Sequence, residues 1–309
     1  MKLFFSLFFL AIHLFARDVV DEKGECSINW SRGFIECKGE SADEQNRYGA
    51  KISAKVIAQR NLLEVIKGVR IDSETTIEDG MFSSDIIKSR VSGTVKGAQV
   101  VSNIYNSTQK YATATLKLKM GKDLLSALLS DPQELSFNEK IMTLWNNFHI
   151  ITTANASTYT TKEKETILKL LEDLRKSADK QGTLYLTKVL HDMDTQNYSG
   201  VLIDISEIKK FKKAMIVKLV DEAGNEIYPA NMVSKRTLLK QNTSVGYIYG
   251  LKDAKQNKRV YHNPIELKAK NIYKKRYSNI VLTKKQIEAI NALDKNILKN
   301  AKIILVLGE

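Results

Sequence analysis

The stretch that decides the fold is residues 50–68, AKISAKVIAQRNLLEVIKG. Alanine recurs at every fourth position at its start, and larger apolar residues continue the same side as far as Ile66. Such a stripe predicts a helix lying close against a sheet, because alanine puts little bulk between the two backbones. We expect this helix to be capped by Ser41 or Asp43 and to end at about Lys67.

Strand patterns stand on both sides of this predicted helix. Before it, residues 26–37 (CSINWSRGFIEC) indicate two strands around a turn. After it, residues 69–77 are rich in β-branched side chains, and a second helix is predicted from 84 to about 91. Strict alternation over residues 111–120 predicts a strand with one buried face. The first module is therefore expected to be a two-layer, helix-on-sheet α+β unit.

The N-terminus indicates export. Residues 1–16 (MKLFFSLFFLAIHLFA) carry one basic residue followed by an apolar run. That run is shorter than the about 20 residues that span a bilayer, which is typical of a cleaved signal peptide, and an uncleaved anchor is the alternative. Arg17 follows the expected cleavage point at Ala16, so no lipid-bearing cysteine is in place. We expect a periplasmic protein without a later membrane span.

The chain has two cysteines, Cys26 and Cys37. In an oxidising compartment they most simply form one disulfide. A two-residue turn at residues 31–32 sets the two cysteines opposite each other, whereas a bulge at Gly33 shifts the register by one. Two free buried thiols are the alternative. A metal site is the weaker interpretation, because no histidine lies near enough in sequence to complete a tetrahedral shell.

The second half of the chain indicates helices first. Apolar spacing predicts short helices at residues 123–129 and 137–148. Thr160-x-x-Glu163 is a capping-box pattern ahead of a third helix. We expect a domain boundary near residues 121–131.

From Gly182 onward, strand patterns dominate. Residues 215–220 and 226–228 predict a hairpin around an Ala-Gly-Asn turn, and the apolar residues 303–307 predict a terminal strand buried inside a sheet. The chain is therefore expected to divide into a signal peptide at 1–16, the first module at 17–120, a helical connecting region at 121–180 and a β-rich α+β domain at 181–309.

The chain is basic, with a formal net charge of +13. An exported protein rarely meets nucleic acid, so anionic envelope surfaces are the better candidate partners. Lysine is nevertheless spread along the chain between acidic residues, which favours ordinary solvated loops and strand edges. Two clusters are the candidate contacts to an anionic surface: Lys209, Lys210, Lys212 and Lys213, and Lys274, Lys275 and Arg276.

No catalytic constellation is apparent in the sequence. His149, His191 and His262 are far apart, and the His191-Asp192-x-Asp194 cluster is typical of a solvated polar turn. Asp204 ends a predicted strand, but one carboxylate does not define catalysis. There is no nucleophile elbow, phosphate-binding glycine loop or metalloprotease helix. We predict no catalytic residue, no cofactor and no metal site.

The order of several short motifs resembles a known family. After the helix at residues 50–68 come Asp79-Gly80, Ser84-Asp85-Ile86, Gly93-x3-Gly97-Ala98 and the strand at 111–120. Together they resemble a family of small bacterial outer-membrane lipoproteins that includes the flagellar basal-disk protein FlgP. The resemblance covers residues 26–120. The lipobox of that family is missing here. The chain therefore resembles the longer, non-lipidated companion protein FlgQ more than it resembles FlgP.

A second, looser resemblance concerns the C-terminal part. The segments Tyr198-Ser-Gly-Val-Leu-Ile-Asp204, Asp221-Glu-Ala-Gly-Asn-Glu-Ile-Tyr228 and Asn263-Pro264 are similar to a C-terminal domain found in longer exported relatives of the same lipoprotein group. That domain carries no enzymatic activity known to us.

The resemblance implies a non-enzymatic, periplasmic structural protein of the flagellar motor, near the outer membrane. It implies a homo- or hetero-oligomer that builds or stabilises the basal disk with a lipidated FlgP-like protein and other motor components. Residues 111–119 and 69–77 are the strands expected to pair with neighbours. The alternative is an envelope-binding module whose basic clusters contact peptidoglycan or anionic lipid, and an enzyme ranks third.

Overall fold

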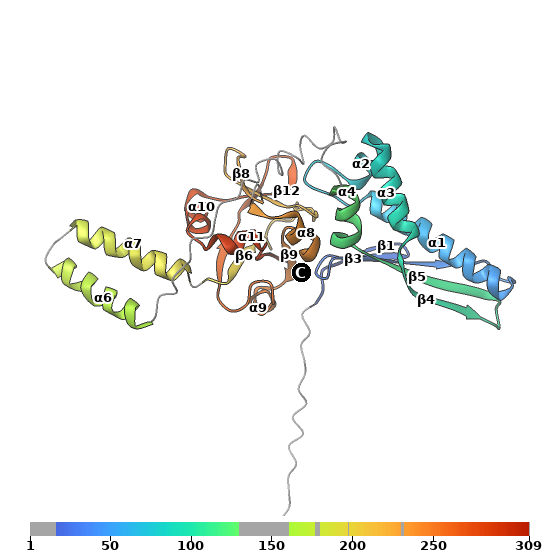
Figure 1. Cartoon of the computed structure of the whole chain (residues 1–309), viewed down its shortest axis with the longest axis horizontal. Helices are drawn as coiled ribbons and strands as arrows, with labels where there is room; N and C mark the ends of the chain where they lie inside the picture. Colours follow the sequence, from blue (N-terminus) through green and yellow to red (C-terminus); the bar gives the residue numbers. More distant parts are fainter. Residues whose placement is uncertain (1–16, 130–160, 177–179, 197, 230–231, 309) are drawn as a thin grey trace, which may run out of the picture.

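The computed structural model describes residues 17–129, 161–176, 180–196, 198–229 and 232–308 (Figure 1). Within them the chain has the α+β class, with an N-terminal helix-on-sheet unit followed by a β-rich C-terminal unit. No helix among these residues is both long and apolar enough to cross a bilayer. The expected signal at 1–16 and the predicted helix at 137–148 lie outside the described residues.

Five antiparallel strands form the N-terminal sheet in the order β1-β2-β3-β5-β4. In register, Cys26 lies opposite Cys37 and Ile28 opposite Ile35, which confirms the unshifted alignment of the first hairpin. The strands are β1 (Val20–Lys23), β2 (Cys26–Asn29), β3 (Phe34–Glu40), β4 (Gln99–Asn106) and β5 (Tyr111–Lys119).

Helix α1 (Arg47–Lys67) covers one face of this sheet (Figure 1). Its alanine stripe is fully buried, as predicted. Gly39 of β3 permits the close approach, because a Cβ there would lie 2.2 Å from the backbone nitrogen of Ala58. The helix begins later than expected because Asn46 provides the cap. The hydroxyl oxygen of Ser41 instead accepts a hydrogen bond from the N–H of Ala112 in the sheet.

The prediction of a strand at residues 69–77 is wrong. These residues form a loop with one isolated bridge, Arg70 to Thr76, and α2 (Ile77–Ser83) begins at its end. Thr76 and Asp79 form a reciprocal capping box there, so the local hydrogen bonds favour a helix. The apolar residues of the loop are buried in the core instead of lying along a strand.

The remaining helices before the C-terminal unit form two groups. Next to α3 (Asp85–Lys96), which confirms the second predicted helix, lie η1 (Met120–Leu125), a π-helix, and α4 (Ser126–Leu129). Further along, α6 (Thr161–Lys176) and α7 (Lys180–Gln196) pack against each other around Leu171 and Leu190, and Figure 1 shows this pair projecting from the body. The expectation of strands from Gly182 onward is therefore wrong, and strands resume at Gly200.

Two four-stranded sheets build the C-terminal unit, in the orders β10-β6-β13-β9 and β11-β12-β7-β8. The first is entirely parallel, and its member β13 (Ile303–Leu307) lies between β6 (Gly200–Asp204) and β9 (Gly246–Tyr249), which confirms the buried terminal strand. The predicted hairpin is also present, as β7 (Lys218–Val220) and β8 (Glu226–Tyr228). The other elements are β10 (Pro264–Lys268), β11 (Asn271–Tyr273), β12 (Arg276–Val281), α8 (Lys235–Gln241), α9 (Leu251–Lys255), α10 (Lys284–Asn291) and α11 (Lys295–Lys299).

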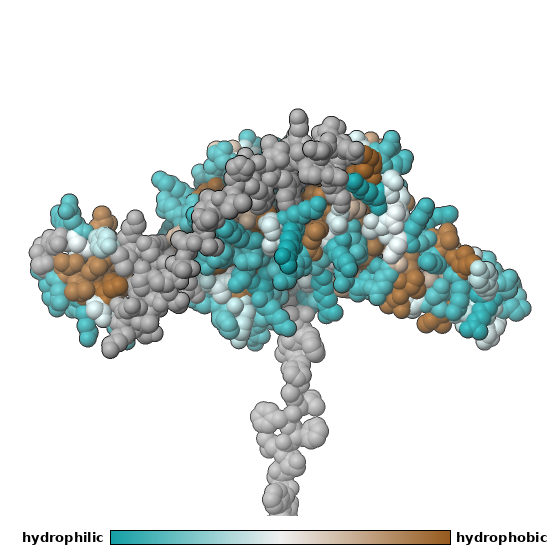
Figure 2. Space-filling model, in the orientation of Figure 1, coloured by the Kyte–Doolittle hydropathy of each residue, from teal (hydrophilic) through white to brown (hydrophobic). Residues whose placement is uncertain are grey.

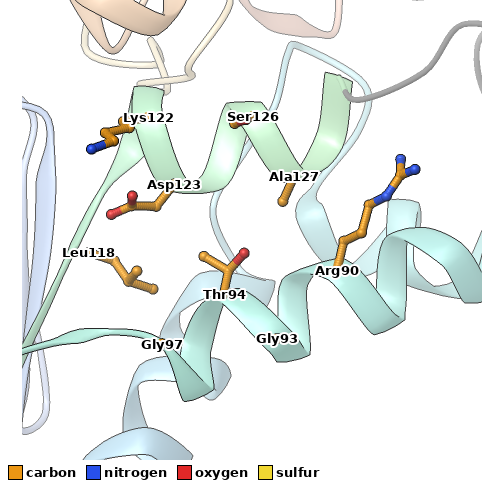
Figure 3. A pocket seen from close by; sticks show the side chains of 9 residues that line it. All are labelled: Arg90, Gly93, Thr94, Gly97, Leu118, Lys122, Asp123, Ser126 and Ala127. Atoms are coloured by element: carbon orange, nitrogen blue, oxygen red, sulfur yellow. The ribbon is translucent and has the colours of Figure 1, made fainter.

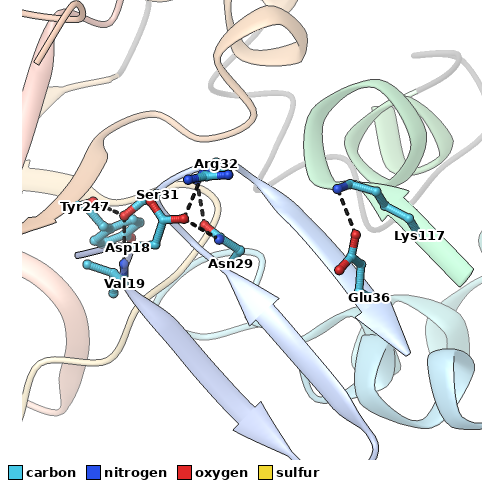
Figure 4. A network of polar contacts seen from close by, with 8 residues as sticks. All are labelled: Asp18, Val19, Asn29, Ser31, Arg32, Glu36, Lys117 and Tyr247. Atoms are coloured by element: carbon cyan, nitrogen blue, oxygen red, sulfur yellow. Dashed lines mark hydrogen bonds and ion pairs between the residues drawn. The ribbon is translucent and has the colours of Figure 1, made fainter. Parts of the chain in front are cut away.

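The N-terminal and C-terminal units share one continuous hydrophobic core. At their junction the hydroxyl of Ser31 donates to the carbonyl oxygen of Tyr247 at 2.8 Å and accepts from the N–H of Val19 at 2.8 Å (Figure 4). Trp30 packs edge-on against the Tyr247 ring, with centroids 5.6 Å apart. The turn of the disulfide hairpin is thus inserted into the C-terminal unit, and a Cβ at Gly33 would lie 2.4 Å from the Asn242 Cβ.

Candidate assembly edge and basic cleft

The two cysteines form the expected disulfide between β2 and β3. Cys26 and Cys37 are both buried, so the bond lies inside the core and not on the surface. It closes a loop with a sequence separation of 11 residues. Closing such a loop contributes about 2–4 kcal/mol, mainly by restricting the unfolded chain.

The strands expected to pair with neighbours are not available for pairing. β5, the strand at residues 111–119, lies between β3 and β4, so both of its edges are already hydrogen-bonded. Residues 69–77 do not form a strand at all. Among the described strands of this sheet, the two edges belong to β1 and β4.

The β1 edge is protected by charge. Three of its four residues are ionisable, and charged edges discourage strand addition. The carboxylate of Asp21 is bound on both sides, by the Nε1–H of Trp30 at 2.8 Å and by the ammonium of Lys213 at 2.9 Å. This ion pair ties the edge strand to the C-terminal unit.

The β4 edge has none of these protections. Its sequence, QVVSNIYN, contains no charged residue, and among the described residues it pairs with β5 alone. Val100, Val101 and Ile104 are 43%, 51% and 65% exposed. A bulge falls between Val100 and Ser102, and the register is regular from there to Asn106. An uncharged, partly apolar edge of this length is a site for strand addition.

Hydrogen bonds to α1 and to the segment just before it hold β4 in place. The Asn103 side-chain N–H donates to the Lys51 carbonyl oxygen at 3.2 Å, and the Tyr105 hydroxyl donates to the Gln45 carbonyl oxygen at 3.0 Å. The strand is therefore a fixed edge and not a loose flap. The sequence pattern did not reveal it, because the bulge and the mixture of polar and apolar residues hide the alternation. The absence of charge over its eight residues does not mark it as an edge either, because an interior strand is uncharged as readily.

Helix α1 adds an apolar stripe at the same end of the molecule. Tyr48, Ile52 and Val56 are spaced by four residues and are 78%, 45% and 49% exposed. They lie away from the alanine stripe, which faces the sheet. Figure 2 shows hydrophobic residues gathered at the end of the molecule that α1 and β4 form. Large apolar residues grouped on a surface mark interaction sites more often than isolated ones do.

The structure brings the two predicted basic clusters to neighbouring positions. The backbone N–H of Lys212 donates to the carbonyl oxygen of Tyr277 at 2.9 Å, next to Arg276. The ammonium of Lys212 lies 5.1 Å from the Tyr277 ring centroid. Sequence reasoning could not foresee this adjacency, because 60 residues lie between the two clusters.

Members of the clusters have different surroundings. Lys213 is bound to Asp21, and Arg276 to Glu74 at 2.9 Å, so both join the two units structurally. The remaining five are exposed: Lys209, Lys210, Lys212, Lys274 and Lys275.

A cleft of about 730 Å³ lies where the loop before α2 meets the β11–β12 hairpin. Tyr273 fixes one side, because its hydroxyl donates to the Ala223 carbonyl oxygen at 2.7 Å. Lys274 holds its ammonium 4.8 Å from the Tyr273 ring centroid. The lining residues are Ser73, Glu74, Gly224, Tyr273, Lys274, Lys275 and Arg276.

A family match covers the C-terminal unit. Residues 200–309 match the second domain of Treponema pallidum Tp0624. The matched region begins at the first residue of β6 and includes both C-terminal sheets and one wall of the basic cleft. No curated protein matches the chain. The match to the Tp0624 domain does not include the N-terminal unit, to which β4 belongs.

A polar network lies inside the Tp0624-like region. Arg259 donates from Nε to the Ala301 carbonyl oxygen at 2.6 Å and from Nη2 to the Thr243 carbonyl oxygen at 2.8 Å. Burial lowers the pKa of Arg259 to about 10. Burial also raises the pKa of the phenols of Tyr228 and Tyr247, whose hydroxyls donate to backbone carbonyls. Because the partners are backbone groups, this network positions strands.

A second cavity, of about 520 Å³, lies between α3 and the η1–α4 segment (Figure 3). Its charged side chains do not converge, since Arg90 and Lys122 point in opposite directions in Figure 3. The Asp123 carboxylate accepts a hydrogen bond from the backbone N–H of Lys119 at 2.8 Å. This cavity has no common focus for a ligand.

The remaining sequence candidates are placed as follows. His262 is exposed, with its ring 4.0 Å from the Tyr261 ring centroid. The Asp204 carboxylate accepts from the N–H of Ser206 at 2.9 Å, which is a turn interaction. His149 and the side chains of residues 191–194 lie outside the described part of the chain. Within the described part, no three His, Cys, Asp or Glu residues are grouped as metal ligands.

Proposed function

We propose that this protein is a non-enzymatic structural subunit of the periplasm that assembles with further copies of itself through the β4 edge. We assign that assembly to the basal disk beneath the outer membrane of the bacterial flagellar motor. The observation that carries the assembly role is β4 itself, an eight-residue uncharged edge strand with three exposed branched side chains.

Strand addition at β4 would remove two unfavourable features of the free edge at once. The backbone groups along its outer edge gain main-chain partners, and Val100, Val101 and Ile104 lose exposed apolar surface. Another copy is a compatible partner, since two uncharged strands meet without like-charge repulsion. The charged and ion-paired β1 edge does not compete for the same partner.

The internal structure suits a building block. One core runs through the N-terminal and C-terminal units, so a contact made at β4 positions the whole body. The buried disulfide fixes the hairpin that carries the junction. Rigid subunits lose less conformational entropy when they assemble than flexible ones do.

The flagellar assignment has a different basis. It rests on the resemblance of residues 26–120 to the basal-disk family and on the export pattern at residues 1–16. The disulfide supports an oxidising compartment. A FlgP-like lipidated companion is the second partner in this proposal.

The assembly is tested by analytical ultracentrifugation of the mature protein and of Ile104→Lys. We expect concentration-dependent oligomers for the wild type and a monomer for the variant, because a lysine on the edge opposes strand pairing. Phe82→Lys is the matched control, since Phe82 is 83% exposed on α2, away from β4, and the same change there should leave the oligomers intact. A wild type that stays monomeric at high concentration contradicts self-assembly.

The flagellar assignment is tested separately in a deletion strain. We expect impaired motility and a missing or incomplete disk in tomograms, with rescue by the wild type but not by Ile104→Lys. Normal swimming together with an intact disk would reject the flagellar role while leaving the measured oligomers unaffected.

A further inference from the structure

We propose that the basic cleft beside the β11–β12 hairpin binds the phosphate of an anionic phospholipid headgroup. This inference does not depend on β4 or on the flagellar assignment. It starts from the position of the cleft, which is bounded by the loop before α2 on one side and by the hairpin at residues 273–276 on the other.

The charge balance of the cleft is positive. Lys274, Lys275 and Arg276 contribute three cations to its lining, against the single carboxylate of Glu74. Arg276 binds that carboxylate at 2.9 Å. Neither Lys274 nor Lys275 forms an ion pair with a carboxylate of the described residues. An anion entering the cleft therefore meets two ammonium groups whose charge no described carboxylate offsets.

The neighbouring charges leave this balance in place. Glu222 and Lys270 line a smaller cavity of about 380 Å³ that shares Tyr273 and Lys274 with the cleft. As one acidic and one basic residue, they add no net charge to the cavity that includes Lys274. On the sheet side, Lys212 adds a further exposed cation next to Tyr277.

The hairpin tip packs closely against the turn at Gly224. Lys274 has a left-handed backbone, with φ 51°, and Gly224 takes φ 96° in the facing turn. A Cβ at Gly224 would lie 2.3 Å from Cζ of Tyr273, so the ring occupies the space that the glycine leaves open. The face of this ring also lies against the Lys274 ammonium. The cation–π contact positions the ammonium but leaves its positive charge available to an anion.

Arg276 suits phosphate in particular. A guanidinium has five N–H donors in one plane, and the ion pair with Glu74 is made by Nη2. Glu74 therefore orients the group at the cleft and leaves other donors for a second anion. Arginine and lysine side by side provide both the directional donors and the point charge that phosphate groups require.

The surroundings favour a membrane surface over a small solute. Lys212 is exposed next to the strand that carries Arg276 but does not line the cleft, and the exposed residues Lys209 and Lys210 precede it in sequence. A bilayer containing anionic lipid presents many phosphates to the same face. Each lysine near such a surface strengthens binding about fivefold at moderate salt.

The test is cosedimentation of the mature protein with vesicles of phosphatidylcholine alone or with about one third phosphatidylglycerol. We expect binding to the anionic vesicles only, and weaker binding at high salt. The double variant Lys274→Glu/Lys275→Glu should bind at least about tenfold more weakly. The matched control Lys284→Glu/Lys285→Glu makes the same charge change at exposed positions on α10, outside the cleft lining, and should lose less than about threefold.

Three outcomes overturn the inference. Equal losses in the two double variants would mean that overall charge and not the cleft governs binding. Binding to isolated peptidoglycan but not to vesicles would identify a polymer ligand. Release of the protein from the vesicles by millimolar inorganic phosphate would identify a site for free phosphate.

Discussion

The hydroxyl of Ser31 reaches the carbonyl oxygen of Tyr247 at 2.8 Å across 216 residues of sequence. The bond lies at the tip of the disulfide hairpin, where the first strands of the protein meet the parallel sheet of the C-terminal unit (Figure 4). Met215 and Ile216 extend the junction by backbone hydrogen bonds to Arg70 and Ile71. The two units are therefore expected to unfold together.

Trp30→Ala should lower the free energy of unfolding by about 3–5 kcal/mol, because it empties a buried aromatic site and removes the contact with the Tyr247 ring. Urea denaturation followed by circular dichroism measures the change. Phe82→Ala is the control, and its exposed position predicts a change within about 0.5 kcal/mol. Two separate transitions in the wild type would contradict the single shared core.

The disulfide should resist reduction in the folded protein, because both Cys26 and Cys37 are buried. We expect a thiol-labelling reagent added with mild reductant to modify neither cysteine until denaturant is present. Cys26→Ser/Cys37→Ser should lower the free energy of unfolding by about 2–4 kcal/mol. Rapid labelling of the native protein would show that the hairpin opens on its own.

Two glycine substitutions should have opposite effects. Gly39→Ala places a methyl group 2.2 Å from the Ala58 backbone nitrogen, so α1 must move away from the sheet, and we expect a loss of several kcal/mol. Gly93→Ala meets nothing within 4 Å inside α3 and should stabilise by about 0.5–1 kcal/mol. Melting temperatures of the two variants check the prediction. Similar shifts of the same sign would contradict the close packing at Gly39.

The α2 cap should respond to acid. Hydrogen bonds from Thr76 lower the pKa of Asp79 below its ordinary value of 3.8. A carboxylate whose pKa is lower in the folded state contributes stability above the unfolded pKa, and this contribution is lost as pH falls through the folded value. The stability difference between the wild type and Asp79→Asn should therefore be present at neutral pH and shrink below about pH 3.8. A difference that is constant down to pH 2 would contradict this role.

The sequence predicts elements well where one periodicity dominates. The alanine stripe of α1, the alternation of β5 and the apolar strand β13 all lie where expected. The pattern at residues 69–77 misled because β-branched side chains fill a core from a loop as readily as from a strand. There the capping box of Thr76 and Asp79 decided the local structure.

The candidate sites were harder to predict for a different reason. An edge strand is defined by its neighbours, and nothing within the sequence of β4 or β5 tells which of the two lies outside. The basic cleft likewise depends on the loop at Ser73, the turn at Gly224 and the hairpin tip meeting in space. Local patterns identified the cations but not the carboxylate of Glu74 that accompanies them.

The position of β13 has a consequence for the order in which the parallel sheet can form. β6 and β9 do not pair with each other, because β13 lies between them and provides the hydrogen bonds that join both to one sheet. Along the chain β13 follows β9 only after β10, β11 and β12, so the parallel sheet stays incomplete until this later strand inserts. β9 pairs with β13 and not with β6, so it cannot join the sheet before β13 does.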